Sequence, residues 1–292
     1  MPLSRERLSQ YRAQTFRTAP GLRLTSVDQA VDFVNQRGYI FFWPIKNVTM
    51  PSLWVAVAGD RPVPNDHEDP GQISWDWKDS LLGKRRWYYG RVLCKRNSII
   101  ALDVLPYFYA LSPNYGDYEE DYLIDYEAGS LPLAAKLIYE ALLKEGPLDT
   151  ITLRKKAGLT SRASDTEFNH ALDNLQATFR IMPTGVADAG AWHYAFIYDI
   201  VPRYFPDLSE RAHPITEPEA RQKLIQIYLN SLGAASFKDL QRFFCTQPLS
   251  WDPKRLRSDL QKMEDRGELR QSVEVESLPN PCVVTAALLS ED

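Results

Sequence analysis

The apolar positions in the second half of the chain follow one order twice, from Leu131 to about Ile200 and from Glu217 to about Leu289. In each copy, apolar residues at helical spacing are followed by a glycine-led turn, a short helix, a second amphipathic helix and two runs typical of strands. A helix–turn–helix followed by a β-hairpin is the plan of the winged helix, which mostly serves to place a helix in a DNA groove. The pattern therefore predicts two winged-helix units in tandem.

The second amphipathic helix of each copy sets the two copies in register. It is predicted over 163–179 in the first copy and over 253–266 in the second. Such spacing places one apolar stripe on the buried side of a helix. The apolar residues are Phe168, Leu172 and Leu175 in the first helix and Leu256, Leu260 and Met263 in the second.

The two helices differ in charge, and only one of them suits DNA. The helix over 163–179 carries acidic residues against Arg162 and Arg180, which makes a poor surface for phosphates. The helix over 253–266 is the better candidate because its charges are mainly basic. These residues are Asp165, Glu167 and Asp173 in the first helix and Lys254, Arg255, Arg257 and Lys262 in the second.

The first half of the chain contains the same kinds of element in a less regular order. Residues 25–38 predict a helix that is capped by Thr25 or Ser26 and stopped by Gly38. The apolar run YIFFWPI follows and is expected to be buried. WYYGRVLC and SIIALDV predict a hairpin across Lys95-Arg96-Asn97, which would be a further wing.

These patterns together predict an α+β, mostly helical fold made of three tandem winged-helix units. The first unit, residues 1–113, is degenerate and carries the basic hairpin. An acidic, tyrosine-rich connector covers 114–129. The second unit covers 130–204 and the third covers 205–292. The short helix of the second unit is expected over 151–158, with Asp149, Thr150 or Thr152 as its cap.

Basic clusters suggest where phosphates would bind, although the net charge of −4 counts against a strongly basic surface. Local clusters decide phosphate affinity. A solvated face is the competing interpretation of each cluster, because charge runs are common on surfaces. The preferred phosphate contacts are Lys84, Arg85, Arg86, Arg91, Lys95 and Arg96, and the second choices are Arg154, Lys155, Lys254, Arg255 and Arg257.

Several function classes find no support in the sequence. No phosphate-binding glycine-rich loop is present, so we expect no nucleotide cofactor. The run Asp66-His67-Glu68-Asp69 lacks metal-ligand spacing, and His170, His193 and His213 are scattered, so we expect no metal. The MPLSRERLSQYRAQTFR start has no apolar core, and no uncharged apolar run approaches the roughly 20 residues of a membrane span. With three widely spaced cysteines, Cys94, Cys245 and Cys282, this favours a cytoplasmic protein.

Four segments carry a resemblance to a known family. They read FWPIKNVTMPSLW, WDWKDSLLGKRRWYYGRVL, LPYFYALS and AKLIYEALLKEGPL. The chain resembles the AlkZ-like (YcaQ-type) winged-helix family, which contains bacterial DNA glycosylases that act on alkylated bases and interstrand crosslinks. The resemblance covers nearly the whole chain. It implies tandem winged helices curled into a C-shape with DNA in the concave channel.

The resemblance also locates the family's catalytic motif, a Gln-x-Gln or Gln-x-Asp on the strand after the first amphipathic helix. Here that stretch reads Ile40-Phe41-Phe42-Trp43-Pro44, and the two motif positions fall on Phe41 and Trp43. Neither side chain can act as a base. The basic, histidine-containing segment that follows in the family is shortened to 46–50. The chain ends at LLSED, near where the family continues into further strands, so the third unit is expected to be truncated, either naturally or because the sequence is cut.

Three groups of aromatic and acidic residues in the first half have roles that the sequence leaves open. Phe41, Phe42 and Trp43 are either core residues or a platform for stacking an unpaired base. Trp75, Trp77, Lys78 and Asp79 either line a pocket or belong to a helix packed on the hairpin 87–103. A replacement acid for glycosylase chemistry could come from three carboxylates, Asp76, Asp79 and Asp103.

The sequence therefore predicts a monomeric protein that binds double-stranded DNA on a glycosylase-like scaffold, in the repair of alkylated or crosslinked DNA, with catalysis left open. The alternative is a protein-interaction or regulatory scaffold without a nucleic-acid role. A sequence pI near 5.7 and the acidic connector favour that alternative. Neither the lesion nor a protein partner can be deduced from the sequence.

Overall fold

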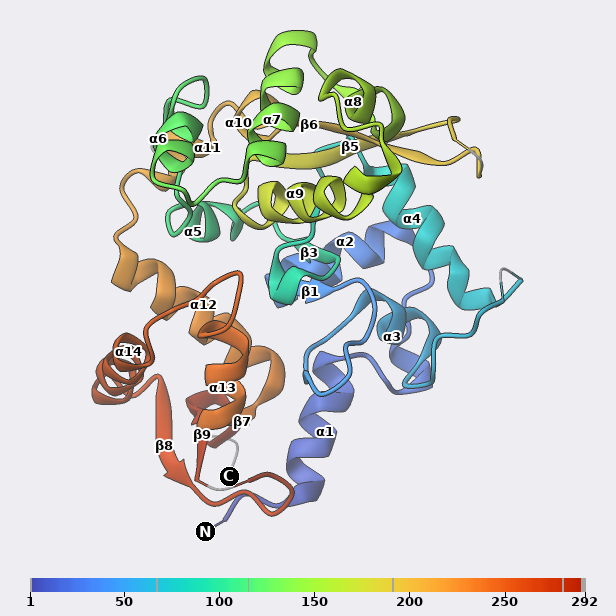
Figure 1. Cartoon of the computed structure of the whole chain (residues 1–292). Helices are drawn as coiled ribbons and strands as arrows, with labels where there is room; N and C mark the ends of the chain where they lie inside the picture. Colours follow the sequence, from blue (N-terminus) through green and yellow to red (C-terminus); the bar gives the residue numbers. More distant parts are fainter. Residues whose placement is uncertain (1, 67, 115, 191, 280, 290–292) are drawn as a thin grey trace.

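The computed structural model describes residues 2–66, 68–114, 116–190, 192–279 and 281–289. Within these ranges one order of elements occurs three times: helix, strand, helix, helix, strand, strand (Figure 1). The first set lies between residues 27 and 100. Its elements are α2 (Val27–Arg37), β1 (Tyr39–Phe41), α3 (Leu53–Ala58), α4 (Ile73–Leu81), β2 (Tyr88–Gly90) and β3 (Ser98–Ile100).

The second and third sets correspond to the two copies seen in the sequence. In the second set, a 3-10 turn at Arg162–Ser164 precedes the long helix, which starts two residues later than predicted. The second set comprises α7 (Leu133–Glu145), β4 (Leu148–Asp149), α8 (Thr150–Lys156), α9 (Asp165–Ala177), β5 (Ile181–Ala187) and β6 (Ala195–Ile200). The third comprises α12 (Glu217–Leu232), β7 (Ala234–Ser236), α13 (Phe237–Phe244), α14 (Pro253–Asp265), β8 (Leu269–Val273) and β9 (Cys282–Thr285).

Each set forms a three-stranded antiparallel sheet with its last strand in the middle, in the orders β1-β3-β2, β4-β6-β5 and β7-β9-β8. Ile40 pairs with Ile99, and Ala235 pairs with Val283 at the equivalent place in the third sheet. The predicted α+β, mostly helical class is confirmed. The division into independent winged-helix units at the predicted boundaries, and their C-shaped arrangement, stay predictions.

Side-chain caps explain where several helices begin. Ser26 accepts a hydrogen bond from the backbone N–H of Gln29 at the start of α2. Asp149 caps α8, and Asp252 caps α14 with Pro253 in the first turn. Because these side chains satisfy backbone donors that a helix start leaves free, they were predictable from the local sequence.

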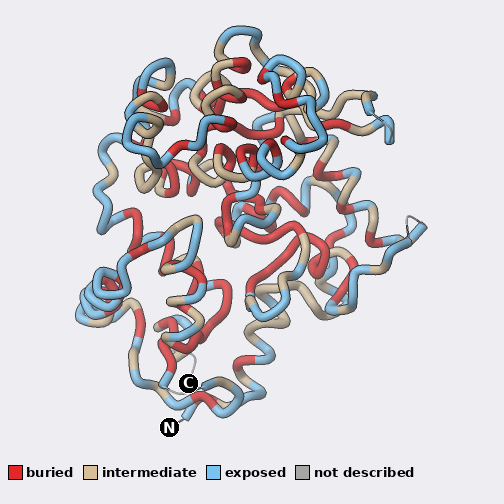
Figure 2. The backbone as a smooth tube through the Cα atoms, in the orientation of Figure 1, coloured by how far each residue is buried: buried red, intermediate tan, exposed pale blue. Residues whose placement is uncertain are grey.

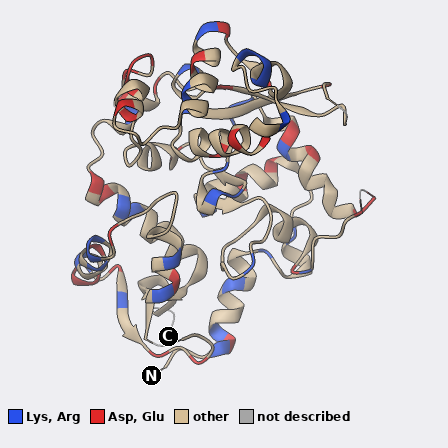
Figure 3. Cartoon of the chain, in the orientation of Figure 1, with Lys and Arg blue, Asp and Glu red and all other residues tan. Residues whose placement is uncertain are grey.

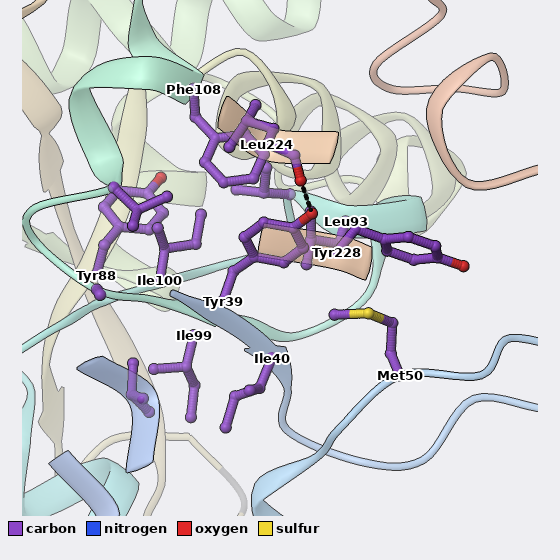
Figure 4. Close-up of a cluster of buried hydrophobic side chains, with 14 of the residues drawn as sticks. Tyr39, Ile40, Met50, Tyr88, Leu93, Ile99, Ile100, Phe108, Leu224 and Tyr228 are labelled. Carbon is purple, nitrogen blue, oxygen red and sulfur yellow. Dashed lines mark hydrogen bonds between the residues drawn. The ribbon is translucent and has the colours of Figure 1, made fainter. Parts of the chain in front are cut away.

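The first and third sets share one hydrophobic core, which extends into the segment that follows β6. The Tyr39 hydroxyl of β1 donates a hydrogen bond of 2.7 Å to the Leu224 carbonyl of α12, inside a cluster that also contains Phe108 and Tyr228 (Figure 4). Figure 2 shows β1 and β3 as buried stretches in the middle of the molecule. The second set has a separate core built on α7 and α9.

The N-terminal helix α1 (Arg5–Thr15) packs on the third set, although the predicted first unit included it. The Tyr11 hydroxyl donates to the Asn230 carbonyl at 2.8 Å, and Arg12 donates to the Leu232 and Ala234 carbonyls at 2.9 and 2.8 Å. Leu3 forms a parallel β-bridge with Val275. The two ends of the described chain therefore lie together (Figure 1).

The acidic stretch predicted as a connector folds partly into a helix, α6 (Asp121–Glu127), that is tied to the second set. Arg180 donates to Asp121 at 2.8 Å and to Asp125 at 2.6 Å, and its side chain is only 1% exposed. Arg180 was expected among the surface charges of the helix over 163–179, and this was wrong because it lies beyond α9 and points inward.

Short helices complete the described chain. None of the helices in the described ranges combines the length and apolarity that crossing a bilayer requires. The remaining α-helices are α5 (Leu105–Tyr109), α10 (Val201–Tyr204), α11 (Leu208–Ala212) and α15 (Ala286–Leu289). Short 3-10 turns occupy Pro20–Leu22, Pro70–Gln72 and Leu93–Lys95.

Candidate nucleic-acid interface

Strand directions in the first sheet bring three separate segments to one end. Ser98, the first residue of β3, pairs with Phe41 at the end of β1 and with Gly90 at the end of β2. The residues that follow β1, follow β2 and precede β3 must therefore lie close together. They line a pocket of about 340 Å³, formed by Trp43, Pro44, Ile45, Lys46, Arg91, Lys95, Arg96 and Asn97. We call it the basic pocket.

Trp43 forms the aromatic wall of the basic pocket and is held from behind by other rings. Its ring centroid lies 4.6 Å from that of Phe42, 5.1 Å from that of Trp54 and 6.2 Å from that of Trp75. Phe41 and Phe42 are 0% exposed and belong to the core, whereas Trp43 is half-buried. Of the three residues at the catalytic-motif stretch, only Trp43 can therefore meet a ligand.

Four cations surround this indole, and three of them are not neutralised. Lys46, Lys95 and Arg96 are exposed, and within the described residues no salt bridge joins them to a carboxylate. Arg91 instead contacts Asp173 of α9 at 2.7 Å. Figure 3 shows the basic turn before β3 near the middle of the view, with further basic segments along α13 and α14.

The turn that presents Lys95 has an unusual backbone. Cys94 and Lys95 have φ angles of 50° and 55°, in the left-handed region that L-residues seldom occupy. Each such residue costs of the order of 1–2 kcal/mol in an ordinary context. Conformations of this kind cluster at functional sites, where the surrounding structure enforces them.

The predicted phosphate contacts at 84–86 lie outside the basic pocket. Arg86 forms an ion pair of 3.1 Å with Asp28, and the Arg85 guanidinium lies 4.9 Å from the centre of the Tyr204 ring. Lys84 is exposed in the same turn. Of the six preferred contacts, the structure therefore gathers only Arg91, Lys95 and Arg96.

The second-choice contacts are spread over two further helices and are partly occupied. Arg154 forms an ion pair with Asp165 and donates to the Leu159 carbonyl at 2.6 Å. Arg255 contacts Glu217 at 2.9 Å. The remaining cations are not so paired: Lys155 and Lys254 are exposed, and the Arg257 guanidinium lies 4.7 Å from the centre of the Phe237 ring.

A second cavity of about 670 Å³ adjoins the basic pocket on the side of α9, and Lys95 lines both. Asp173 lines the second cavity and Arg91 lines the first, so their ion pair stands between the two. The lining of the second cavity includes Pro132, Glu167 and His170. This explains why α9 is not a free recognition helix: part of its polar face already contacts the first set.

Behind Trp43 lies a buried amine that the sequence could only suggest. Lys78 on α4 is 0% exposed, and its Nζ lies 2.7 Å from Asp79 and 2.8 Å from the Tyr194 hydroxyl. Rings of Phe42, Trp75, Tyr89, Tyr194 and Phe196 surround it, with the Trp75 centroid at 3.8 Å.

Burial lowers the pKa of Lys78, and the neighbouring carboxylate of Asp79 opposes that shift. Burial also raises the pKa of Tyr194, with the charge of Asp79 acting in the same direction. Tyr194 and Phe196 come from the second set, more than a hundred residues away along the chain. No local pattern could have revealed them. The cluster joins two sets and opens onto neither cavity.

The predicted pocket candidates and replacement acids accordingly do not lie together in the basic pocket. Trp75 packs against Trp43, Lys78 lies over the Trp75 ring, and Trp77 is buried in the shared core. Asp76 and Asp103 are exposed, and Asp79 is bound to Lys78 and Tyr194. None of these three carboxylates lines the basic pocket.

The histidines and the Asp66–Asp69 loop offer no assembled metal site within the described ranges. His67 itself lies outside the described residues. Asp66 accepts a hydrogen bond from the backbone N–H of Glu68, and Asp69 pairs with Arg61 at 2.5 Å. His193 contacts Asp188 at 2.7 Å, and His170 lines the second cavity.

Comparison with known proteins places this geometry in a family. The model of the AlkZ-related family matches residues 24–245. The chain belongs to the AlkZ-related family. The predicted resemblance is thus confirmed, and the matched range includes the whole first and second sets.

The fold is also similar to that of a solved AlkZ protein. The DNA glycosylase AlkZ of Streptomyces sahachiroi superposes with a TM-score of 0.60 at 15% sequence identity, over 99% of this chain and 73% of that chain. At this identity the similarity shows the fold alone. No curated protein sequence matches this AlkZ-related chain.

Proposed function

We propose that this AlkZ-related chain binds DNA through the basic pocket and does not excise bases by the usual route of its relatives. One observation carries the proposal. A half-buried indole and three cations that no described carboxylate neutralises converge at one end of the first sheet, where the resemblance locates the catalytic motif. Cations that neutralise phosphates supply most of the affinity of non-specific DNA binding.

The chemistry of the pocket lining favours recognition over excision. Glycosidic bond cleavage by a glycosylase needs a group that activates water or stabilises the sugar cation. The lining holds four cations, Trp43 and the amide of Asn97, but no carboxylate among its eight described residues. Cations near the sugar would oppose, and not stabilise, a developing positive charge. A role in finding or marking damaged DNA fits this lining.

A salt titration of duplex binding tests the proposal. The logarithm of affinity should fall linearly with the logarithm of salt concentration, by about 0.9 per phosphate contacted. The double variant Lys95→Glu, Arg96→Glu should weaken binding and flatten this slope by about 2. The double variant Lys144→Glu, Lys223→Glu, which makes the same change of charge at exposed lysines on α7 and α12, is the control. A slope that the double variant leaves unchanged would exclude the basic pocket.

A base-release assay on alkylated and crosslinked duplexes tests the second half of the proposal. We expect no release above background, with or without Asp79→Ala. Release that persists in Asp76→Ala, Asp79→Ala and Asp103→Ala would show that the scaffold excises bases by other residues.

A second candidate, a protein-interaction scaffold, has one specific observation in its favour. Trp192, near the tip of the β5–β6 hairpin, is 90% exposed, and Ile151 on α8 is 54% exposed. Large exposed aromatic residues are enriched where proteins meet. Failure to bind DNA together with capture of a protein partner that Trp192→Ala abolishes would favour this function.

A further inference from the structure

The basic pocket has the size of a small-ligand site and not of a duplex groove. Pockets for single small ligands measure about 300–1,000 Å³, and this one measures about 340 Å³. Bases in an intact duplex are stacked and paired, so none of them presents a free face to an indole in such a pocket. A nucleotide outside the helix does present one.

The aromatic wall is held in place by neighbouring rings. Trp43 packs against Phe42, Trp54 and Trp75, so it has little rotational freedom left to lose. Trp54 is fixed in turn, because the Arg61 guanidinium lies 5.1 Å from its ring centre. A braced, half-buried indole that lines a pocket is a preformed surface for a flat, uncharged ring.

The remaining walls of the pocket offer partners for the phosphates and for the polar edge of a base. Lys46 and Arg96 line the pocket and can meet phosphate oxygens, and Lys95 lines both this pocket and the second cavity. The Asn97 backbone carbonyl accepts a hydrogen bond of 2.8 Å from the Phe42 backbone N–H, while the Asn97 side-chain amide has no hydrogen-bond partner within the described residues. An amide can both donate to and accept from a base edge.

We infer that the basic pocket holds one unpaired nucleotide, with its base on Trp43 and its phosphates on Lys46, Lys95 and Arg96. This inference rests on the proposed function and specifies its substrate class: nucleic acid that contains an unpaired nucleotide, in preference to continuous duplex. Stacking of this kind tolerates any base, because every base has a flat face. The pocket would thus respond to DNA structure and not to sequence.

The test compares three probes on the full chain: a blunt duplex, the same duplex with a short single-stranded thymidine tail, and thymidine monophosphate. The tailed duplex should bind about tenfold more tightly than the blunt one, which is the scale that base–aromatic stacking provides. Trp43→Leu, which keeps an apolar side chain but removes the ring, should abolish the preference. Trp43→Phe should retain most of it, and Trp192→Ala, the exposed tryptophan outside the pocket, should retain all of it.

Tryptophan fluorescence gives a readout that does not depend on affinity. Stacking on the tail should quench wild-type emission more than that of Trp43→Phe. Equal binding of tailed and blunt duplexes, or a preference that survives in Trp43→Leu, would overturn the inference while salt-dependent duplex binding still upheld the proposed function. Tight binding of thymidine monophosphate without binding of either duplex would overturn both.

Discussion

At the scale of single residues, the cluster around Lys78 was partly predictable: the sequence indicated its local members but not its partners from distant parts of the chain. The neighbourhood of Trp75, Lys78 and Asp79 was recognisable, because an amine and a carboxylate directly follow two tryptophans. The partners Tyr194 and Phe196 were not, since they come from the second set, more than a hundred residues further along the chain. The sequence likewise left two interpretations open for Phe41 and Phe42, and the structure shows that both are buried in the core.

Replacing Lys78 distinguishes the contribution of its bulk to the free energy of unfolding from that of its charge. Lys78→Ala should lower the free energy of unfolding by about 2–5 kcal/mol, because it leaves a cavity among five rings. The double variant Lys78→Met, Asp79→Asn should stay within about 1 kcal/mol of the wild type, since a buried ion pair can often be replaced by uncharged side chains of similar volume. Urea titration measures both. Equal losses in the two variants would mean that the charge itself is required.

The lowered pKa of Lys78 also predicts a dependence on pH. Below the folded-state pKa, the amine is protonated in both states and its burial opposes folding. Between that pKa and the ordinary value of 10.5, the unfolded chain holds more protons, so stability rises with pH in this alkaline window. The wild type should therefore gain stability relative to Lys78→Met as pH rises through the window. A difference that is constant with pH would argue against this titration.

At the scale of elements, helix starts and the three hairpins followed from the sequence, while the third strand of each sheet and the surroundings of each helix did not. Ser26, Asp149 and Asp252 cap the predicted helices because capping depends only on neighbours along the chain. The roles of Arg180 and of α9 depend on tertiary contacts with residues that are distant along the chain. Asp173 was treated as a surface charge, but it neutralises Arg91 of the basic pocket.

Asp173→Asn should therefore release Arg91 for a phosphate. We expect tighter DNA binding than in the wild type and a salt slope steeper by about 1, because one more cation becomes available. Asp207→Asn is the matched control, since Asp207 pairs with Arg211 on α11, which is neither in the basic pocket nor among the predicted phosphate contacts. Fluorescence anisotropy at several salt concentrations distinguishes the two. Equal changes in both variants would indicate a general effect of charge.

At the scale of the whole molecule, the internal repeat was predictable and the sharing of cores was not. Periodicity predicts which face of an element is buried, but it does not indicate which distant element covers it. The first set is covered by α12 and the third by α1, so the order along the chain is not the order of packing. This is why the first predicted unit, 1–113, took in a helix that lies on the third set.

Arg12→Ala tests the contact that joins the two ends of the chain. The variant loses hydrogen bonds to the Leu232 and Ala234 carbonyls, each worth about 1.5–3 kcal/mol when the donor is charged. Hydrogen exchange should become faster in α1 and around residues 230–236, and remain unchanged in α7 and α9. Uniform acceleration over the whole chain would mean that the end contact is not a local one.

The hydrogen bond from Tyr39 to Leu224 means that the first sheet can be covered only late in translation. When the ribosome has released residues up to about 200, all three strands of the first sheet exist, yet the helix that covers Tyr39 has not emerged. Tyr39 must therefore wait for a partner that lies 185 residues further along the chain. A stalled nascent chain of that length should be open to proteases at the first sheet, while the independently packed second set is already resistant.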